Sequence, residues 1–128
     1  MKSEKRQRKF HRINYDGKAY LQFFDDRYES CEVENLSLGG MYVKGQLRQP
    51  KGKECQIKLF HKDTSGDNSL LATAEVIWKS DEGVGLKFTK MTFENYMLLT
   101  TTLINNAEQP AIILYQFPKK APFEINNN

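Results

Sequence analysis

The stretch LLATAEVIWK, Leu70 to Lys79, alternates apolar and polar side chains almost without interruption. In an extended strand, successive side chains point to opposite faces, so Leu70, Ala72, Ala74, Val76 and Trp78 share one side. This alternation is typical of a strand with one buried and one solvated face. We therefore predict a β-strand over residues 70–79 whose core face includes Trp78.

The same period of two recurs from Gly17 to Phe88, with Gly, Asp, Asn and Ser residues between the segments. Six short antiparallel strands in this span suit a small closed barrel, because closure removes the edges that would otherwise pair between molecules. The fold class is therefore predicted as all-β dominated, a six-stranded antiparallel β-barrel with a C-terminal α-helix. Besides 70–79, the predicted strands are Lys18–Phe24, Ser30–Asn35, Met41–Lys44, Glu54–Phe60 and Gly83–Phe88.

After Phe88 the spacing of the apolar residues changes from that of a strand to that of a helix. Thr92 is placed to cap a helix that fades near residues 105–107, and Pro110 opens a tail whose segment 111–117 is apolar enough to dock on its own barrel or on another chain. The residues predicted to share one stripe of this helix are Phe93, Tyr96, Met97, Thr100, Leu103 and Ile104. We divide the chain into a flexible basic arm (1–15), the barrel with its helix (16–106) and a tail (107–128).

Length, composition and cysteine content indicate a single-domain protein without a membrane span. The 128 residues, 39% of them hydrophobic, suit one domain with a core. No apolar run is long enough to span a membrane or to serve as a secretory signal, which favours a cytoplasmic location. Cys31 and Cys55 lack the CxxC spacing of a redox or zinc motif and are expected to be buried free thiols.

Positive charge is concentrated at the amino terminus. Residues 1–12 hold six Lys or Arg against one Glu, a net charge of +5, which leaves −2 for the rest of a chain whose total is +3. The stretch RQRKFHR, Arg6 to Arg12, could be a solvated tail, a nucleic-acid arm or a grip for a phosphate-bearing ligand. Arg8 and Arg12 suit the last use, because a guanidinium donates two hydrogen bonds to phosphate or to guanine O6 and N7 and also stacks on a base.

A second polar motif, NLSLGG, lies at residues 35–40 between two predicted strands. Asn35 and Ser37 are two residues apart, so we expect their side chains to point the same way and form a small polar platform. Gly39 and Gly40 lack a Cβ and allow a planar or phosphate group to approach the main chain. Taken alone, the motif also fits an ordinary turn.

Together, the two motifs resemble the PilZ domain family of bacterial cyclic di-GMP receptors. RKFHR fits the family's RxxxR motif, NLSLGG fits its [D/N]xSxxG motif, and GVGLKF at residues 83–88 is similar to its final strand. The resemblance covers about residues 5–105 and implies a PilZ-type barrel with a C-terminal helix. It also implies a single-domain receptor that passes its signal to an unidentified downstream protein, in motility or biofilm control.

The resemblance assigns roles to individual residues. It implies that Arg8 and Arg12 contact phosphate and guanine, that Asn35, Ser37 and the Gly40 backbone hold the guanine edge, and that the arm folds over the ligand. Asn35 stands where Asp is more usual in the family. Trp78 is either a core residue at the barrel rim or a guanine-facing aromatic, and the possible additional contacts are Arg6, Gln7, Lys9 and Gly39. The number of ligand molecules bound stays open.

Other functions find less support in the sequence. There is no paired-carboxylate, GxSxG or Walker-type motif, so no enzymatic activity and no cofactor is predicted. A zinc site would have to combine His11, His61, Cys31 and Cys55 at irregular spacing, and no metal is expected. Two alternatives stay open: a PilZ-like module that binds only proteins, and a nucleic-acid-binding barrel with a basic arm. The second is less favoured because the chain after the arm is net negative. Its base-stacking side chains would be Phe10, Tyr15, Tyr20, Phe23 and Phe24.

Overall fold

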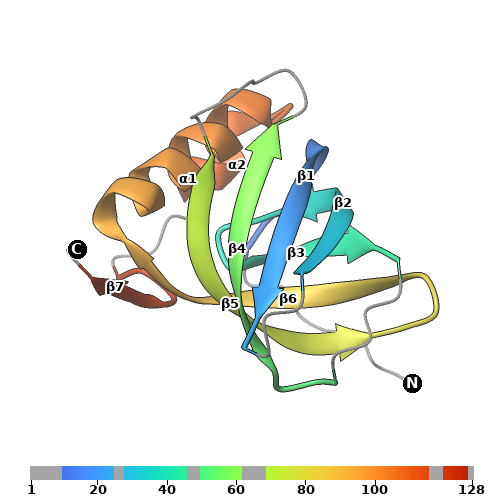
Figure 1. The fold of residues 1–128 in the computed structure, drawn as a ribbon. Coiled ribbons are helices and arrows are strands. Elements are labelled where there is room, and N and C mark those ends of the chain that lie inside the picture. Colours follow the sequence, from blue (N-terminus) through green and yellow to red (C-terminus); the bar gives the residue numbers. More distant parts are fainter. Residues whose placement is uncertain (1–9, 25–27, 46–49, 62–68, 116–119, 127–128) are drawn as a thin grey trace, which may run out of the picture.

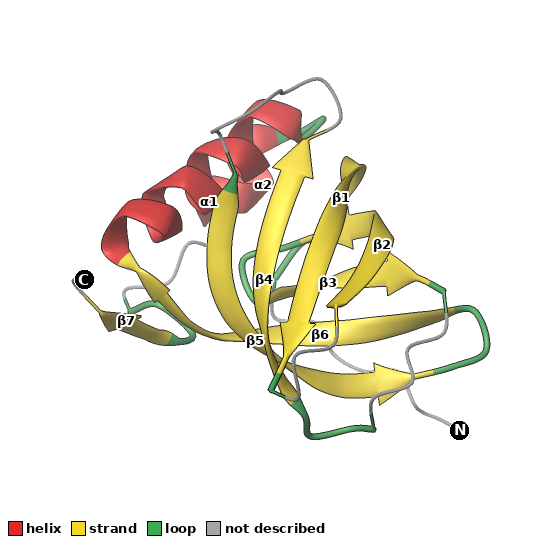
Figure 2. Cartoon of the chain, viewed as in Figure 1, coloured by secondary structure: helices red, strands yellow, loops and turns green. Residues whose placement is uncertain are grey.

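The computed structural model describes residues 10–24, 28–45, 50–61, 69–115 and 120–126. Strands form most of it, and the helices lie together on one side (Figure 2). The elements are β1 (Ile13–Phe23), β2 (Tyr28–Leu36), β3 (Gly40–Lys44), β4 (Glu54–His61), β5 (Leu70–Lys79), β6 (Gly83–Thr92), α1 (Phe93–Asn106), α2 (Pro110–Tyr115) and β7 (Glu124–Asn126).

The strands close into a barrel. Their order is β3-β2-β1-β4-β5-β6, every neighbouring pair is antiparallel, and β3 also pairs with β6 to complete the ring. This confirms the predicted six-stranded antiparallel barrel (Figure 1). The strand at 70–79 has the predicted bounds, whereas β1 starts at Ile13 and includes residues 13–15, which the sequence analysis assigned to the arm.

The barrel interior is the hydrophobic core. Alternate residues of β1 from Ile13 to Phe23 are buried, and Leu70, Ala72, Ala74 and Val76 of β5 face the same core. The placement of Trp78 on the core face was wrong: its side chain is 40% exposed. The pairing of β5 with β6 shifts between Val76 and Trp78, and this extra residue in β5 reverses the alternation and turns Trp78 outward.

Helix α1 follows β6 directly and lies across one end of the barrel (Figure 1). The predicted cap is confirmed, since Thr92 Oγ1 accepts hydrogen bonds from the Asn95 backbone N–H (3.1 Å) and from Asn95 Nδ2 (2.8 Å). The buried residues of α1 are Tyr96, Leu99, Thr100 and Leu103. The predicted stripe was therefore wrong at Phe93 and Met97, which are exposed, and it omitted Leu99.

The tail folds back on its own barrel. Pro110 begins α2, where a missing N–H costs nothing, and Ile113 of α2 is buried in the core. Further along, β7 pairs in parallel with the end of β6, and the Phe123 ring meets Tyr96 edge-on at 5.4 Å between centroids. Residues 116 and 117 of the predicted apolar segment lie outside the described residues. Within the described part of the chain, no helix is both long and apolar enough to cross a membrane.

Candidate functional site

The NLSLGG motif forms the tight connection between β2 and β3. Ser37 Oγ accepts hydrogen bonds from the backbone N–H groups of Gly39 (3.1 Å) and Gly40 (3.3 Å), and the Ser37 N–H donates to the Gly40 carbonyl (2.8 Å). Ser37 is only 8% exposed. The predicted joint platform with Asn35 assumed strand geometry as far as Ser37, but β2 ends at Leu36 and the Ser37 hydroxyl is engaged inside its own turn. Ser37 therefore shapes the loop.

The two glycines of the motif serve different contacts. A Cβ on Gly40 would collide with the carbonyl oxygen of Leu86, because Gly40 lies where β3 closes against β6. A Cβ on Gly39 would instead lie 3.3 Å from Cδ2 of Phe10. Gly40 thus permits barrel closure, whereas Gly39 permits the Phe10 ring to approach the turn.

Phe10 brings the basic arm to this turn. It stands between the two arginines of RKFHR, is partly buried, and packs against the core next to Gly39. Arg12 is described and exposed, and it directly precedes Ile13, which is paired with Leu36 at the end of β2. Arg6, Gln7, Arg8 and Lys9 lie outside the described residues. The two sequence motifs therefore meet at Phe10 and Gly39, although they are separated by more than twenty residues in the chain.

Beside the turn, four residues from four strands form a continuous row on the outer barrel surface. Asn35 of β2 is the partner of Tyr42 on β3, Tyr42 is the partner of Gly85 on β6, and Gly85 is the partner of Trp78 on β5. Directly opposite residues of antiparallel strands project from the same face. We call Asn35, Tyr42, Gly85 and Trp78 the cross-strand row.

The cross-strand row presents two aromatic rings and an amide. The ring centroids of Tyr42 and Trp78 are 5.6 Å apart with planes 40° from parallel, and Gly85 between them carries no side chain. Gly83 also leaves room for Tyr42, because a Cβ there would meet the tyrosine hydroxyl. At the other end, Asn35 Oδ1 is buried and has no hydrogen-bond partner among the described residues. A buried acceptor of this kind is costly unless a donor reaches it.

Comparison with known proteins identifies the family. The family model of the PilZ domain matches residues 6–104, which spans both motifs and the cross-strand row. The chain belongs to the PilZ domain family.

Solved PilZ structures share the barrel at low sequence identity. The PilZ domain of CeSA from a cellulose-synthesizing bacterium is 16% identical with a TM-score of 0.61, and the match covers 74% of this chain and 96% of that one. The PilZ domain of YcgR from Escherichia coli, solved with c-di-GMP, is 15% identical with a TM-score of 0.64, covering 79% and 92%. The Bacillus subtilis inhibitor of motility MotI/DgrA is 16% identical with a TM-score of 0.63, covering 78% of this chain and 50% of that one. A search of curated proteins found no match.

Tyr42 was not among the candidate site residues predicted from the sequence of this PilZ domain. Its signal was available, because Tyr42 lies two residues after Gly40 in a predicted strand and alternates with the buried Met41 and Val43. What the sequence did not give was its neighbours, since the pairing of Tyr42 with Asn35 and Gly85 depends on which strands close the barrel.

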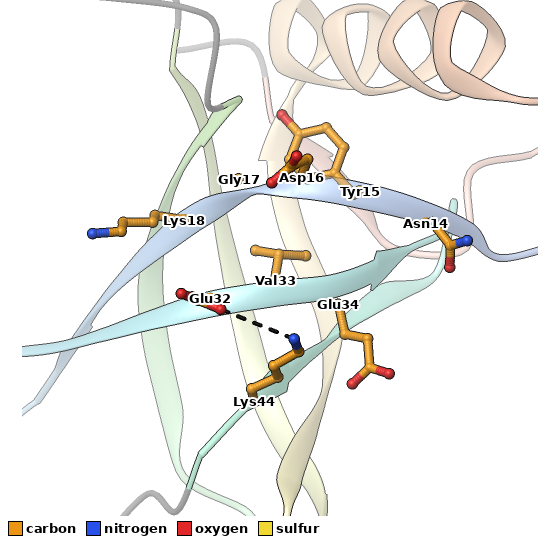
Figure 3. Close-up of a pocket in the computed structure, with 9 residues that line it drawn as sticks. All are labelled: Asn14, Tyr15, Asp16, Gly17, Lys18, Glu32, Val33, Glu34 and Lys44. Carbon is orange, nitrogen blue, oxygen red and sulfur yellow. Dashed lines mark ion pairs between the residues drawn. The ribbon is translucent and has the colours of Figure 1, made fainter.

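A hollow of about 510 Å³ is lined by residues of β1, β2 and β3 (Figure 3). It reaches the row through Asn14, the partner of Asn35. Its lining residues include three acidic ones, Asp16, Glu32 and Glu34, and two basic ones, Lys18 and Lys44. Lys44 lies 4.0 Å from Glu32, and both side chains are exposed, so the pair adds little stability. With more carboxylates than cations, this hollow is unsuited to a phosphodiester.

The remaining sequence-predicted groups lie elsewhere. Cys31 and Cys55 are buried free thiols, as predicted, and burial raises their pKa values to about 11 and about 12. The described residues contain no group of three or more His, Cys, Asp or Glu that could hold a metal ion. Of the aromatics considered for base stacking, Tyr15 and Phe23 are buried, whereas Tyr20 is 39% and Phe24 96% exposed.

Proposed function

We propose that this PilZ domain is a receptor that binds cyclic di-GMP between its basic arm and the turn at residues 35–40. The observation that supports this most directly is the contact of Phe10 with Gly39, because it joins the RxxxR motif to the NxSxxG turn. The YcgR structure with c-di-GMP has the same fold and is consistent with the proposal.

The arm supplies the charge that the ligand needs. Cyclic di-GMP carries two phosphodiester charges, and the net charge of +5 over residues 1–12 contrasts with the acidic hollow on the barrel side. Arg12 precedes β1 beside the turn, and Arg8 is two residues from Phe10, a distance that the backbone spans in at most about 7 Å. Both guanidinium groups are then within reach of a phosphate or a guanine edge at the turn. Arg6, Gln7 and Lys9 are assigned secondary contacts.

The cross-strand row supplies base recognition. Asn35 Oδ1, buried and without a described partner, accepts a hydrogen bond from a guanine N–H, which removes the cost of leaving this acceptor unsatisfied. The exposed ring of Trp78 and the half-buried ring of Tyr42 offer an apolar surface on which a base stacks. The Gly40 backbone is assigned a place beside the guanine edge, Gly39 leaves room for Phe10, and Ser37 holds the turn in shape.

Binding and switching are linked through the arm. Ordering each arm residue costs about 1–2 kcal/mol of backbone entropy, and each charge-assisted hydrogen bond returns about 1.5–3 kcal/mol. Since the ligand supplies these bonds, its binding completes the folding of the arm over the turn, beyond the contact that Phe10 already makes. The ordered arm then presents a new surface to a downstream protein partner. The domain acts as a binding module, without catalysis.

Isothermal titration calorimetry of the whole chain with cyclic di-GMP tests this proposal, with GTP and cyclic di-AMP as controls. We expect selective binding with a Kd in the micromolar range, lost in the Arg8→Ala/Arg12→Ala double variant. The matched control is Lys51→Ala, which removes an exposed cation remote from both motifs in the sequence. Absence of binding by the wild-type chain would refute the receptor function, and unchanged binding by the double variant would refute the assigned grip. Binding of RNA that is independent of guanine and falls steeply with salt would favour the nucleic-acid alternative instead.

A further inference from the structure

A second hollow, of about 400 Å³, lies on the outer face of β1, β4 and β5. These three strands run side by side (Figure 1). Its lining side chains include Tyr20, Gln22, Gln56, Lys58, Phe60 and Leu71. None of them belongs to the turn at residues 35–40 or to the cross-strand row.

Large apolar groups face solvent here in fixed positions. Tyr20 is the partner of Lys58, and Lys58 is the partner of Leu71, so the three side chains project together from adjacent strands. Tyr20 is 39% and Leu71 47% exposed. The Tyr20 and Phe60 rings meet edge to face with centroids 5.4 Å apart, which fixes the wall of the hollow.

Apart from the Tyr20 hydroxyl, the polar side chains that line this hollow are Lys58 and the amides of Gln22 and Gln56. Lys18 is the partner of Phe60, Lys58 Nζ lies 6.0 Å from the Phe60 centroid, and Gln22 is the partner of Gln56. Neither lysine forms an ion pair with a carboxylate of the described residues. Glu32, the partner of Lys18 on β2, is instead paired with Lys44.

This combination selects one class of occupant. Exposed apolar groups bordered by two lysines that form no ion pair among the described residues complement a segment that carries both carboxylates and a bulky apolar side chain. Single-stranded nucleic acid fits less well, because stacking needs an open ring face, and the Phe60 ring already has Lys58 Nζ 6.0 Å from its centroid and the Tyr20 ring packed at 69° to it.

We propose that the face formed by Tyr20, Lys58, Phe60 and Leu71 docks an acidic peptide segment of a protein partner. A leucine or phenylalanine of that segment sits between Tyr20 and Leu71, and its carboxylates lie at Lys18 and Lys58. The glutamine pair Gln22 and Gln56 offers amide donors and acceptors to the backbone of the segment. This docking surface is separate from the proposed nucleotide site and does not depend on it.

The test is a titration of the ¹⁵N-labelled full chain, followed by amide NMR, with the synthetic peptide Ac-Asp-Glu-Asp-Leu-Phe-Asp-Glu-NH₂. Control probes are the same peptide with every acidic residue replaced by Lys, and the oligonucleotide dT₁₀. We expect the acidic peptide to shift amides of β1, β4 and β5 around the hollow. Lys58→Glu should weaken its binding at least tenfold, whereas Lys51→Glu, the same charge change on an exposed turn, should leave it within twofold.

Tyr20→Ser provides a second variant that changes no charge and should also weaken binding. The core amide shifts of each variant report whether the barrel is intact. The proposal is overturned if the acidic peptide leaves these amides unshifted, if the lysine peptide binds equally well, or if dT₁₀ shifts the same amides more strongly. Equal binding by Lys58→Glu and wild type would overturn it as well.

Discussion

The Phe10→Ala variant tests whether anchoring of the basic arm contributes to ligand binding independently of the charge of the arm. Phe10 is not an arginine of the RxxxR motif and carries no group that recognises phosphate. Its ring lies against Gly39 and packs on the core, so it holds the chain on either side of it close to the turn. If the arm binds cyclic di-GMP from this position, removal of the ring should weaken binding although every charged motif residue is retained.

The expected size of the effect follows from burial. A fully buried Phe→Ala change costs about 3–5 kcal/mol, and the partly buried Phe10 should lose about half of that, roughly 2 kcal/mol. Without the anchor, ordering of the adjacent arm residues must come from the ligand, at about 1–2 kcal/mol per residue. Since about 1.4 kcal/mol corresponds to a tenfold change, we expect the Kd for cyclic di-GMP to rise roughly 10- to 50-fold.

Calorimetry gives the Kd, and urea unfolding of the same variant verifies that the barrel is folded under binding conditions. Phe24→Ala is the matched control, because Phe24 is 96% exposed and loses the same atoms without losing a buried contact. Phe10→Leu should restore most of the affinity. If Phe10→Ala binds as tightly as Phe24→Ala, the arm does not act from the position that Phe10 sets, and the proposed clasp is wrong.

Three further predictions follow. Trp78→Ala should raise the Kd about 5- to 150-fold through a lost stacking contact of about 1–3 kcal/mol, with a near-wild-type urea midpoint because the side chain is 40% exposed; a smaller change in Kd would assign Trp78 no contact. Gly40→Ala should lower the free energy of unfolding by about 1–3 kcal/mol or prevent folding, because the added Cβ collides with the Leu86 carbonyl. Gly39→Ala should lower it less, because the Phe10 side chain can shift; equal urea midpoints for the two variants would contradict this. Burial raises the Cys55 pKa from 9.0 to about 12, so above pH 9 this thiol ionises in the unfolded state while it stays protonated in the folded state. The free energy of unfolding, measured by urea titration at several pH values, should therefore fall between about pH 9 and 12, and it should fall less steeply in Cys55→Ala.

The sequence predicted the parts of the fold that depend on local pattern. The alternation of residues 70–79 gave the bounds of β5, and the Thr92 cap located the start of α1. Local pattern did not determine which face of α1 is buried. Phe93 is apolar but lies in the first turn, directly after β6, and stays 55% exposed, whereas Leu99 is fully buried. The tail was harder still, because the docking of Ile113 and the pairing of β7 with β6 are contacts between distant segments.

The candidate site was predictable as two motifs but not as a geometry. RKFHR and NLSLGG could be recognised from their residues, and their roles in binding stay predictions. That they meet depends on Phe10, which the sequence offered only as one of several aromatics for stacking bases. Tyr42 was missed for the same reason, since its neighbours Asn35 and Gly85 are brought to it by barrel closure between β3 and β6.

The orientation of the site residues has a common cause in two β-bulges. Strict alternation in β2 would place Asn35 inside with Val33, yet the β2–β3 register shifts between these residues and Asn35 lies on the outer face. In β5 the shift after Val76 does the same for Trp78. The two bulged strands flank the closing pair β3 and β6, so the bulges turn Asn35 and Trp78 outward on either side of Tyr42. A bulge re-aims a side chain at the cost of a regular ladder, and it depends on the pairing of two strands, so neither strand's sequence predicts it alone. The cross-strand row therefore forms because β-bulges in β2 and β5 interrupt the alternation of inward and outward side chains next to the strands that close the barrel.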